Sequence, residues 1–149
     1  IVKSVIKSNE NRKLFLTKKI NKILKNKIKN KVITFLGVTF KPNTDDMREA
    51  SSLLMIPYLN KKGSKVRYFD PSGEKKDFKN LKNVKFCKNI NLACFKSDLI
   101  IIHTEWNEFK FLNFKKIIKK KNFIIYDMRN IYSPSKMKNK NIKYFGIGR

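Results

Sequence analysis

A cluster of charged residues follows a short apolar run in the first third of the chain. Residues 32–36 (Val-Ile-Thr-Phe-Leu) have the apolar, β-branched and aromatic composition of a strand buried on both faces, and Gly37 ends the run. In open α/β sheets, ligands bind at the loops that leave the carboxyl ends of the strands. Two cations ahead of a helix N-terminus at such a place are suited to bind a phosphate. The charged residues of the loop are Lys41, Asp45, Asp46, Arg48 and Glu49.

A solvated turn that caps the next helix is the alternative interpretation, because Asp and Thr are ordinary N-cap residues. In such a loop Arg48 could pair with Asp45 or Asp46. The stretch from Gly37 to Arg48, however, resembles the Gly-x-x-Phe-Lys-x-x-Thr-Asp-Asp-x-Arg pattern of the UDP-glucose 6-dehydrogenase family without a gap. This family lies within the wider UDP-glucose/GDP-mannose dehydrogenases, and the resemblance is to its C-terminal, UDP-binding domain.

Further motifs of that family follow in the same order. Residues 68–71 resemble its Tyr-Asp-Pro, residues 104–109 its Thr-Glu-Trp-x-x-Phe, residues 127–130 its Asp-x-Arg-Asn and residues 146–149 its closing Gly-x-Gly-Arg. Near the N-terminus, residues 8–13 resemble the Asn-Glu-x-x-Lys/Arg stretch of its long helix. The motifs extend over almost the whole chain, which is identified by them as a member of the family.

The resemblance implies roles for four residues. In the family, the Phe-Lys pair of the first loop contacts the UDP-sugar, which assigns substrate binding to Phe40 and Lys41. The Arg after the Asp-Asp pair lies beside NAD, which assigns cofactor binding to Arg48. The Arg of Asp-x-Arg-Asn reaches the UDP-sugar, which assigns substrate binding to Arg129. Fixed guanidinium and ammonium groups are natural partners of a diphosphate, so these residue types suit the roles.

Each of these cations also has a structural interpretation. Lys41 could be one more solvated lysine of a lysine-rich chain, and Arg129 could form a weak surface salt bridge with Asp127. Asp70 stands where a dinucleotide-binding fold places an acid that binds ribose. The resemblance gives Asp70 no such role, so we expect it to be structural.

Strands and helices alternate along the chain, which predicts an α/β fold with a doubly wound, mainly parallel, Rossmann-like sheet of about six strands. A long N-terminal helix precedes it. Strands are expected at 32–36, 65–70, 84–87, 99–103, 122–127 and 142–147, and helices at 51–62, 89–96 and 114–120.

Right-handed crossovers would place the second and third strands on one side of the first and the later strands on the other. The switch point then lies between the strands that end at Gly37 and His103. Three polar loops, 40–48, 104–106 and 127–130, are therefore expected to converge at the carboxyl ends of the strands.

Residues 1–28 form an uninterrupted apolar pattern at helical spacing, with Lys and Asn between the apolar positions. The resemblance implies that this is the trailing helix of the central, dimerisation domain and that residues 29–149 form the UDP-sugar-binding C-terminal domain. The apolar face of residues 1 to about 25 is expected to lack a partner in this chain. A homodimer is expected for the whole enzyme.

The net charge of +25 invites a nucleic-acid interpretation. Of the 36 basic residues, however, only five are Arg, and the remaining Lys are spread along the chain. Lys, Asn and Ile share A/T-rich codons, so a biased genome explains their excess. We therefore expect no specific nucleic-acid partner, because charge alone gives only non-specific attraction.

Cys87 and Cys94 have no second cysteine pair, and the chain contains one His. This composition predicts neither a metal site nor a disulfide framework, and it favours reduced thiols in a cytoplasmic protein. No apolar run approaches the ~20 residues of a membrane span, so no membrane partner is expected.

The resemblance implies a part of an enzyme. Whole members of the family oxidise UDP-glucose to UDP-glucuronate with two NAD, using an N-terminal Rossmann domain and a nucleophilic Cys in a Gly-Gly-Ser-Cys context. Neither feature occurs here, so no catalytic residue is assigned and NAD is expected to be bound mainly by the missing domain. The alternatives are a stand-alone or vestigial UDP-sugar-binding domain without activity, and a dehydrogenase of another nucleotide sugar.

The 149-residue chain alone is expected to form no NADH from UDP-glucose and NAD, because it lacks the reacting thiol and the NAD fold. NADH absorbance of pure protein with both compounds is the measurement. Turnover above the background rate would contradict the prediction.

Overall fold

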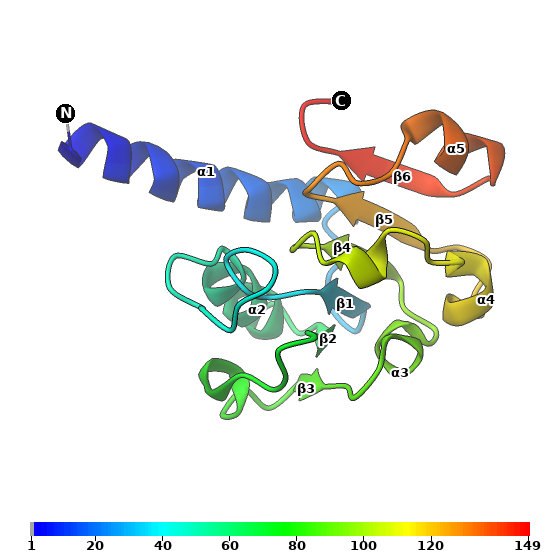
Figure 1. Cartoon of the computed structure of the whole chain (residues 1–149), viewed down its shortest axis with the longest axis horizontal. Coiled ribbons are helices and arrows are strands. Elements are labelled where there is room, and N and C mark those ends of the chain that lie inside the picture. The colour runs from blue at the N-terminus through cyan, green and yellow to red at the C-terminus, as the bar shows by residue number, and fades with distance from the viewer. Residues whose placement is uncertain (1) are drawn as a thin grey trace.

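The computed structural model describes residues 2–149 as a six-stranded parallel sheet with helices on both faces (Figure 1). The strands are β1 (Val32–Leu36), β2 (Lys65–Phe69), β3 (Val84–Phe86), β4 (Leu99–Ile102), β5 (Ile124–Asp127) and β6 (Lys143–Gly146). The helices are α1 (Val2–Ile23), α2 (Ser52–Lys61), α3 (Ile90–Cys94), α4 (Phe114–Ile118) and α5 (Pro134–Asn139), with 3-10 turns η1 (Lys76–Phe78) and η2 (Asn107–Phe109). The predicted strands are confirmed, whereas α5 was not predicted.

The strand order is β3-β2-β1-β4-β5-β6, and every pairing is parallel. This order confirms the doubly wound prediction. β1 lies at the centre and pairs with β2 on one side and β4 on the other, with Leu36 opposite Ile102. The chain therefore leaves β1 and β4 in opposite directions, which creates a switch point where ligands bind in such sheets.

Each face of the sheet is covered by its own set of helices. Side chains at alternate positions, such as Ile33 and Phe35 of β1, enter a core with α1 and α2. The intervening positions, such as Leu36 of β1 and Ile100 of β4, enter a second core with α3, α4 and α5. Burial on both faces explains why β4 is a continuous apolar run rather than an alternating one.

Helix α1 packs on this sheet through its second half only. Leu16, Ile20 and Ile23 are buried in the core shared with α2. The Lys19 ammonium donates to the carbonyl of Gly146 at 2.6 Å. Figure 1 shows the first half of the helix extending beyond the sheet, and its apolar residues are exposed. The expectation of an unpartnered apolar face is therefore wrong from Leu16 onwards, while the domain boundary after residue 28 stays a prediction.

Gly37 makes the closest approach between β1 and the loop that follows β4. Its φ is +75°, and a Cβ at this position would lie 2.5 Å from the Cβ of Thr104. The Thr104 amide donates to the carbonyl of Leu36 at 3.3 Å, and its hydroxyl donates to the carbonyl of Thr39 at 2.8 Å. Only a residue without a side chain allows this joint to close.

We expect Gly37→Ala to destabilise the fold by roughly 1–3 kcal/mol more than Gly148→Ala, because overpacking adds to the strain of positive φ. Gly148 has a φ of +70°, and a Cβ there meets no atom within 4 Å. The control thus carries the backbone strain without the clash. Urea unfolding of both variants is the measurement, and equal losses would contradict the assigned role of Thr104.

Candidate functional site

Arg129 joins the three loops that leave the carboxyl ends of β1, β4 and β5. Its Nε donates to the carbonyl of His103 at 2.7 Å, and its Nη2 donates to the carbonyl of Phe40 at 3.2 Å. These residues follow β4 and β1, and Arg129 itself follows β5. The predicted convergence of the three loops is therefore confirmed.

Glu105 provides the counter-charge of Arg129. Its Oε2 lies 3.1 Å from Arg129 Nε, as an ion pair rather than a hydrogen bond, because the Nε–H is donated to His103. The carboxylate of Asp127 instead accepts from the main-chain N–H of Arg129 at 3.0 Å. Its other oxygen accepts from the Tyr132 N–H and the Tyr144 hydroxyl. The salt bridge with Asp127 considered from the sequence is thus not formed, and the role of Glu105 was not predicted.

A cleft of about 390 Å³ lies between α1 and the carboxyl ends of the strands. Its volume falls within the range of about 300–1,000 Å³ that is usual for small-molecule sites. Phe40, which is 49% exposed, and Arg129 both line it. Its other lining residues are Asn9, Arg12, Lys13, Leu16, Glu49, Ala50, Ser51, His103, Met128 and Ile147.

Lys41 and Arg48 lie on the loop after β1 but do not line this cleft in the described structure. Lys41 is exposed. Arg48 binds Asp46 with two hydrogen bonds, from Nε at 3.1 Å and from Nη2 at 3.0 Å. These bonds from Arg48 hold the pKa of the Asp46 carboxyl below its usual value. Arg48 therefore pairs with Asp46 within the loop, as the structural alternative predicted. Its role in cofactor binding stays a prediction.

His103 lies buried at the floor of the cleft. Its Nε2 accepts from the main-chain N–H of Ser52 at 3.1 Å and lies 2.9 Å from the hydroxyl of Ser51. Its Nδ1 lies 3.0 Å from the Thr104 hydroxyl, which already donates its proton to the carbonyl of Thr39. The ring is therefore a neutral imidazole that carries its proton on Nδ1. Burial, with the nearby charge of Arg129, lowers the pKa of His103 to about 3.

Asp70 has a structural arrangement, as the sequence led us to expect. Its Oδ2 accepts from the main-chain N–H groups of Val38 and Thr39, at 2.8 and 3.3 Å. Its Oδ1 accepts from the N–H and hydroxyl of Ser72. The carboxylate thereby connects the loops after β1 and β2.

The two cysteines are buried and free. Burial raises the pKa of the Cys94 thiol to about 12 and also raises that of Cys87, which keeps both groups in the unreactive thiol form. Residues 2–149 contain no group of acidic, His or Cys side chains that could hold a metal ion.

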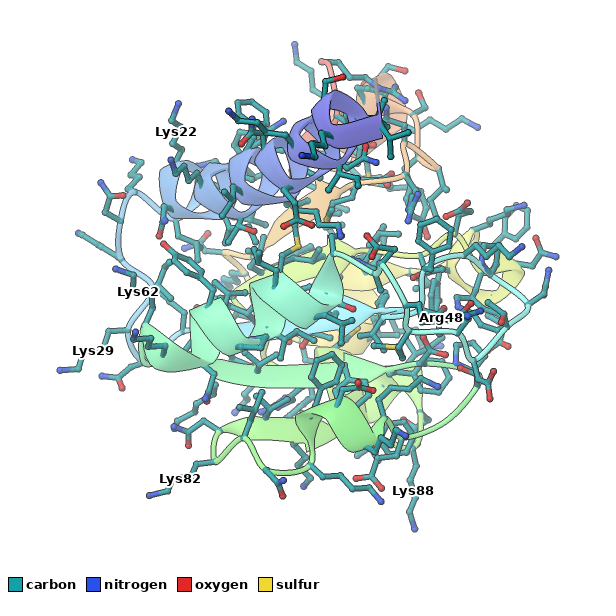
Figure 2. All side chains as sticks on the ribbon, turned by 90° about the vertical axis from the view of Figure 1, so that its left-hand side faces the viewer. Lys22, Lys29, Arg48, Lys62, Lys82 and Lys88 are labelled. Carbon is teal, nitrogen blue, oxygen red and sulfur yellow. The ribbon has the colours of Figure 1, made fainter. Side chains whose placement is uncertain are left out.

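The positive charge of the chain is distributed around the molecule. Figure 2 shows Lys22, Lys29, Lys62, Lys82 and Lys88 pointing outwards from different elements, with Arg48 on a separate loop. None of the helices in the described part of the chain is both long and apolar enough to cross a membrane.

Comparison with known proteins identifies a family. Residues 34–134 match the UDP-binding domain of the UDP-glucose/GDP-mannose dehydrogenase family. The UDP-glucose 6-dehydrogenase of Rickettsia conorii is 39% identical over 99% of this chain, and that of Rhizobium meliloti is 32% identical over 100% of it. The matches cover 35% and 34% of those proteins. The chain thus spans about a third of the length of the curated relatives it matches.

Solved structures show the same fold. The NDP-N-acetyl-D-galactosaminuronic acid dehydrogenase of Methanosarcina mazei superposes with a TM-score of 0.75 at 25% identity, over 93% of this chain and 29% of its own. The UDP-glucose dehydrogenase of Pyrobaculum islandicum gives a TM-score of 0.75 at 23% identity, over 97% of this chain and 31% of its own.

The single histidine makes a pH test possible. Because the pKa of His103 is about 3 in the fold and near 6.5 when unfolded, the unfolded chain binds more protons between these values, and stability falls as the pH falls below 6.5. Between pH 7 and pH 5 we expect the free energy of unfolding of the wild type to fall by about 2 kcal/mol more than that of His103→Gln. Urea unfolding at both pH values is the measurement, and parallel losses would show that His103 does not titrate in this way.

Proposed function

The chain belongs to the UDP-glucose/GDP-mannose dehydrogenase family, and we propose that it is the nucleotide-sugar-binding part of a UDP-glucose 6-dehydrogenase. In this proposal the whole enzyme oxidises UDP-glucose to UDP-glucuronate with two NAD. The chain itself supplies binding groups for the nucleotide sugar. The alternative substrate is another nucleotide sugar, because the solved relatives include dehydrogenases of such compounds.

The observation that carries the proposal is the placement of Arg129 and Phe40 at one cleft beside the switch point. The two hydrogen bonds to the carbonyls of His103 and Phe40 hold the guanidinium in place before any ligand arrives. A guanidinium fixed in this way can bind a diphosphate without a further cost of ordering its side chain. The half-exposed ring of Phe40 offers an apolar face to a base or sugar.

The residues of this domain do not fit a dinucleotide cradle of their own. In such a cradle a glycine after the first strand lets the pyrophosphate approach the backbone. Here the space beside Gly37 is filled by Thr104. We therefore propose that NAD is bound mainly by another part of the enzyme and that Arg48 reaches it from the exposed loop. No reaction step is assigned to the described residues, and the buried thiols of Cys87 and Cys94 agree with a binding role.

The first half of α1 is proposed to lie against the central domain, through which the whole enzyme would form a homodimer. Three of its apolar residues, Val2, Val5 and Ile6, are more than half exposed in this chain. Such residues on one segment favour a partner surface.

We expect Lys41→Ala and Arg129→Ala in the complete enzyme each to weaken UDP binding about ten- to a hundredfold. A charge-assisted contact is worth roughly 1.5–3 kcal/mol, and 1.4 kcal/mol is about a factor of ten. Calorimetric titration of UDP is the measurement, with thermal unfolding to show that each variant is folded.

Lys88→Ala and Lys138→Ala are the matched controls, since both lysines are exposed like Lys41 but belong to none of the family motifs, whereas Lys41 belongs to the Phe-Lys pair of the first loop. They remove the same charge and should change the affinity very little. Equal weakening by all four substitutions would mean that only the diffuse positive field attracts UDP.

A further inference from the structure

We propose that Arg12 of α1, the cation of the cleft without a carboxylate partner among the described residues, binds the diphosphate of the nucleotide sugar together with Arg129. This inference rests on the proposed function and adds to it a binding residue from the N-terminal helix. Three observations support it: the ion pairs of the other two cations of the cleft, the face that α1 presents to the cleft, and the distribution of Arg in the chain.

The cleft is lined by three cations, and two of them already have counter-charges. The ammonium of Lys13 lies 2.8 Å from the carboxylate of Glu49 and 3.4 Å from that of Glu10, which raise the pKa of Lys13. Arg129 is paired with Glu105 at 3.1 Å. Arg12 forms no hydrogen bond or ion pair with any other described residue. Arg12 is therefore the one cation lining the cleft that has no carboxylate partner of its own within residues 2–149, and its guanidinium is free to bind an anion.

The position of Arg12 follows from the periodicity of α1. Asn9, Arg12, Lys13 and Leu16 line the cleft, and their spacing of three and four residues places them on one face of the helix. The same face continues to Ile20, which is buried in the core. Leu16 therefore anchors the helix at the base of the cleft, and Arg12 lies one turn earlier on the wall.

The choice of residue type is informative in a chain so rich in Lys. Only five of the 36 basic residues are Arg, yet two of these five line this cleft. The planar guanidinium binds phosphate oxygens through two parallel hydrogen bonds, which the ammonium of Lys cannot do. Arg12 and Arg129 come from α1 and from the loop after β5, so a diphosphate bound by both would connect the helix to the sheet.

The test is calorimetric titration of the 149-residue chain with UDP and with uridine, comparing Arg12→Gln with Lys18→Gln. Lys18 is an exposed cation of the same helix that does not line the cleft, so the control removes one charge at a similar place. We expect Arg12→Gln to weaken UDP binding about tenfold or more and Lys18→Gln less than twofold. The affinity for uridine, which has no phosphate, should be the same for both variants. Arg12→Lys should restore part of the UDP affinity.

The results separate this inference from the proposed function. If Arg12→Gln binds UDP as well as Lys18→Gln does, while Arg129→Ala loses affinity, the inference fails and the proposed function stands. If uridine binding falls together with UDP binding in Arg12→Gln, Arg12 does not act through the phosphates and the inference also fails. If the wild-type chain binds no UDP, both proposals fail.

Discussion

The structure depends on the contact between Gly37 and Thr104 at the centre of the sheet. Because Gly37 has no side chain, the loop after β4 can pass directly over the end of β1, where Thr104 bonds to the carbonyls of Leu36 and Thr39. His103, the preceding residue, is thereby held between this joint and the N-terminus of α2. The floor of the cleft is thus joined directly to the central strand pair by hydrogen bonds.

The electrostatics of the cleft differ from those of the molecule as a whole. The chain carries a net charge of +25, and the lysines labelled in Figure 2 point outwards from several elements. Solvent and salt screen such charges. At the cleft, in contrast, Lys13 and Arg129 each have a carboxylate partner, and the buried imidazole stays neutral. Among the cations that line the cleft, Arg12 is therefore the one without a carboxylate partner in the described part of the chain.

Much of the fold could be predicted because its strands are continuous apolar runs. β1 was predicted with its observed bounds and β4 within one residue, since burial on both faces leaves an unambiguous pattern. Helix α5 was missed because it is six residues long and buries one apolar side chain, Met137, which gives no periodicity to detect. Helix α1 was expected to extend to residue 28 but ends at Ile23, because Lys25 and Asn26 adopt positive φ, which a right-handed helix cannot contain.

The candidate site was predictable only in part. Strand order alone placed Phe40 and Arg129 at the same ends of the strands, and the structure confirms that place, while their binding roles stay predictions. The positions of Glu105, His103 and Arg12 at the cleft depend on the path of the loops and on how α1 packs against the sheet. These contacts join segments far apart in the chain, and no local pattern encodes them. The family motifs contained Phe40, Arg129, Glu105 and Arg12 but not His103. A motif, however, does not show which carboxylate pairs with which cation.

The way in which Arg129 holds the loops has a consequence for divergence within the family. Its guanidinium binds the carbonyl groups of Phe40 and His103, which every amino acid possesses, and not their side chains. The side chain of Phe40 can therefore change during evolution while the loops stay joined, whereas that of His103 also accepts from the N–H of Ser52 and has a structural part of its own. At Phe40 the two parts of one residue are thus separated, since its carbonyl holds the loop and its side chain lines the cleft. A substitution of Phe40 can alter the wall of the cleft while the contact that joins the loops after β1 and β5 remains in place.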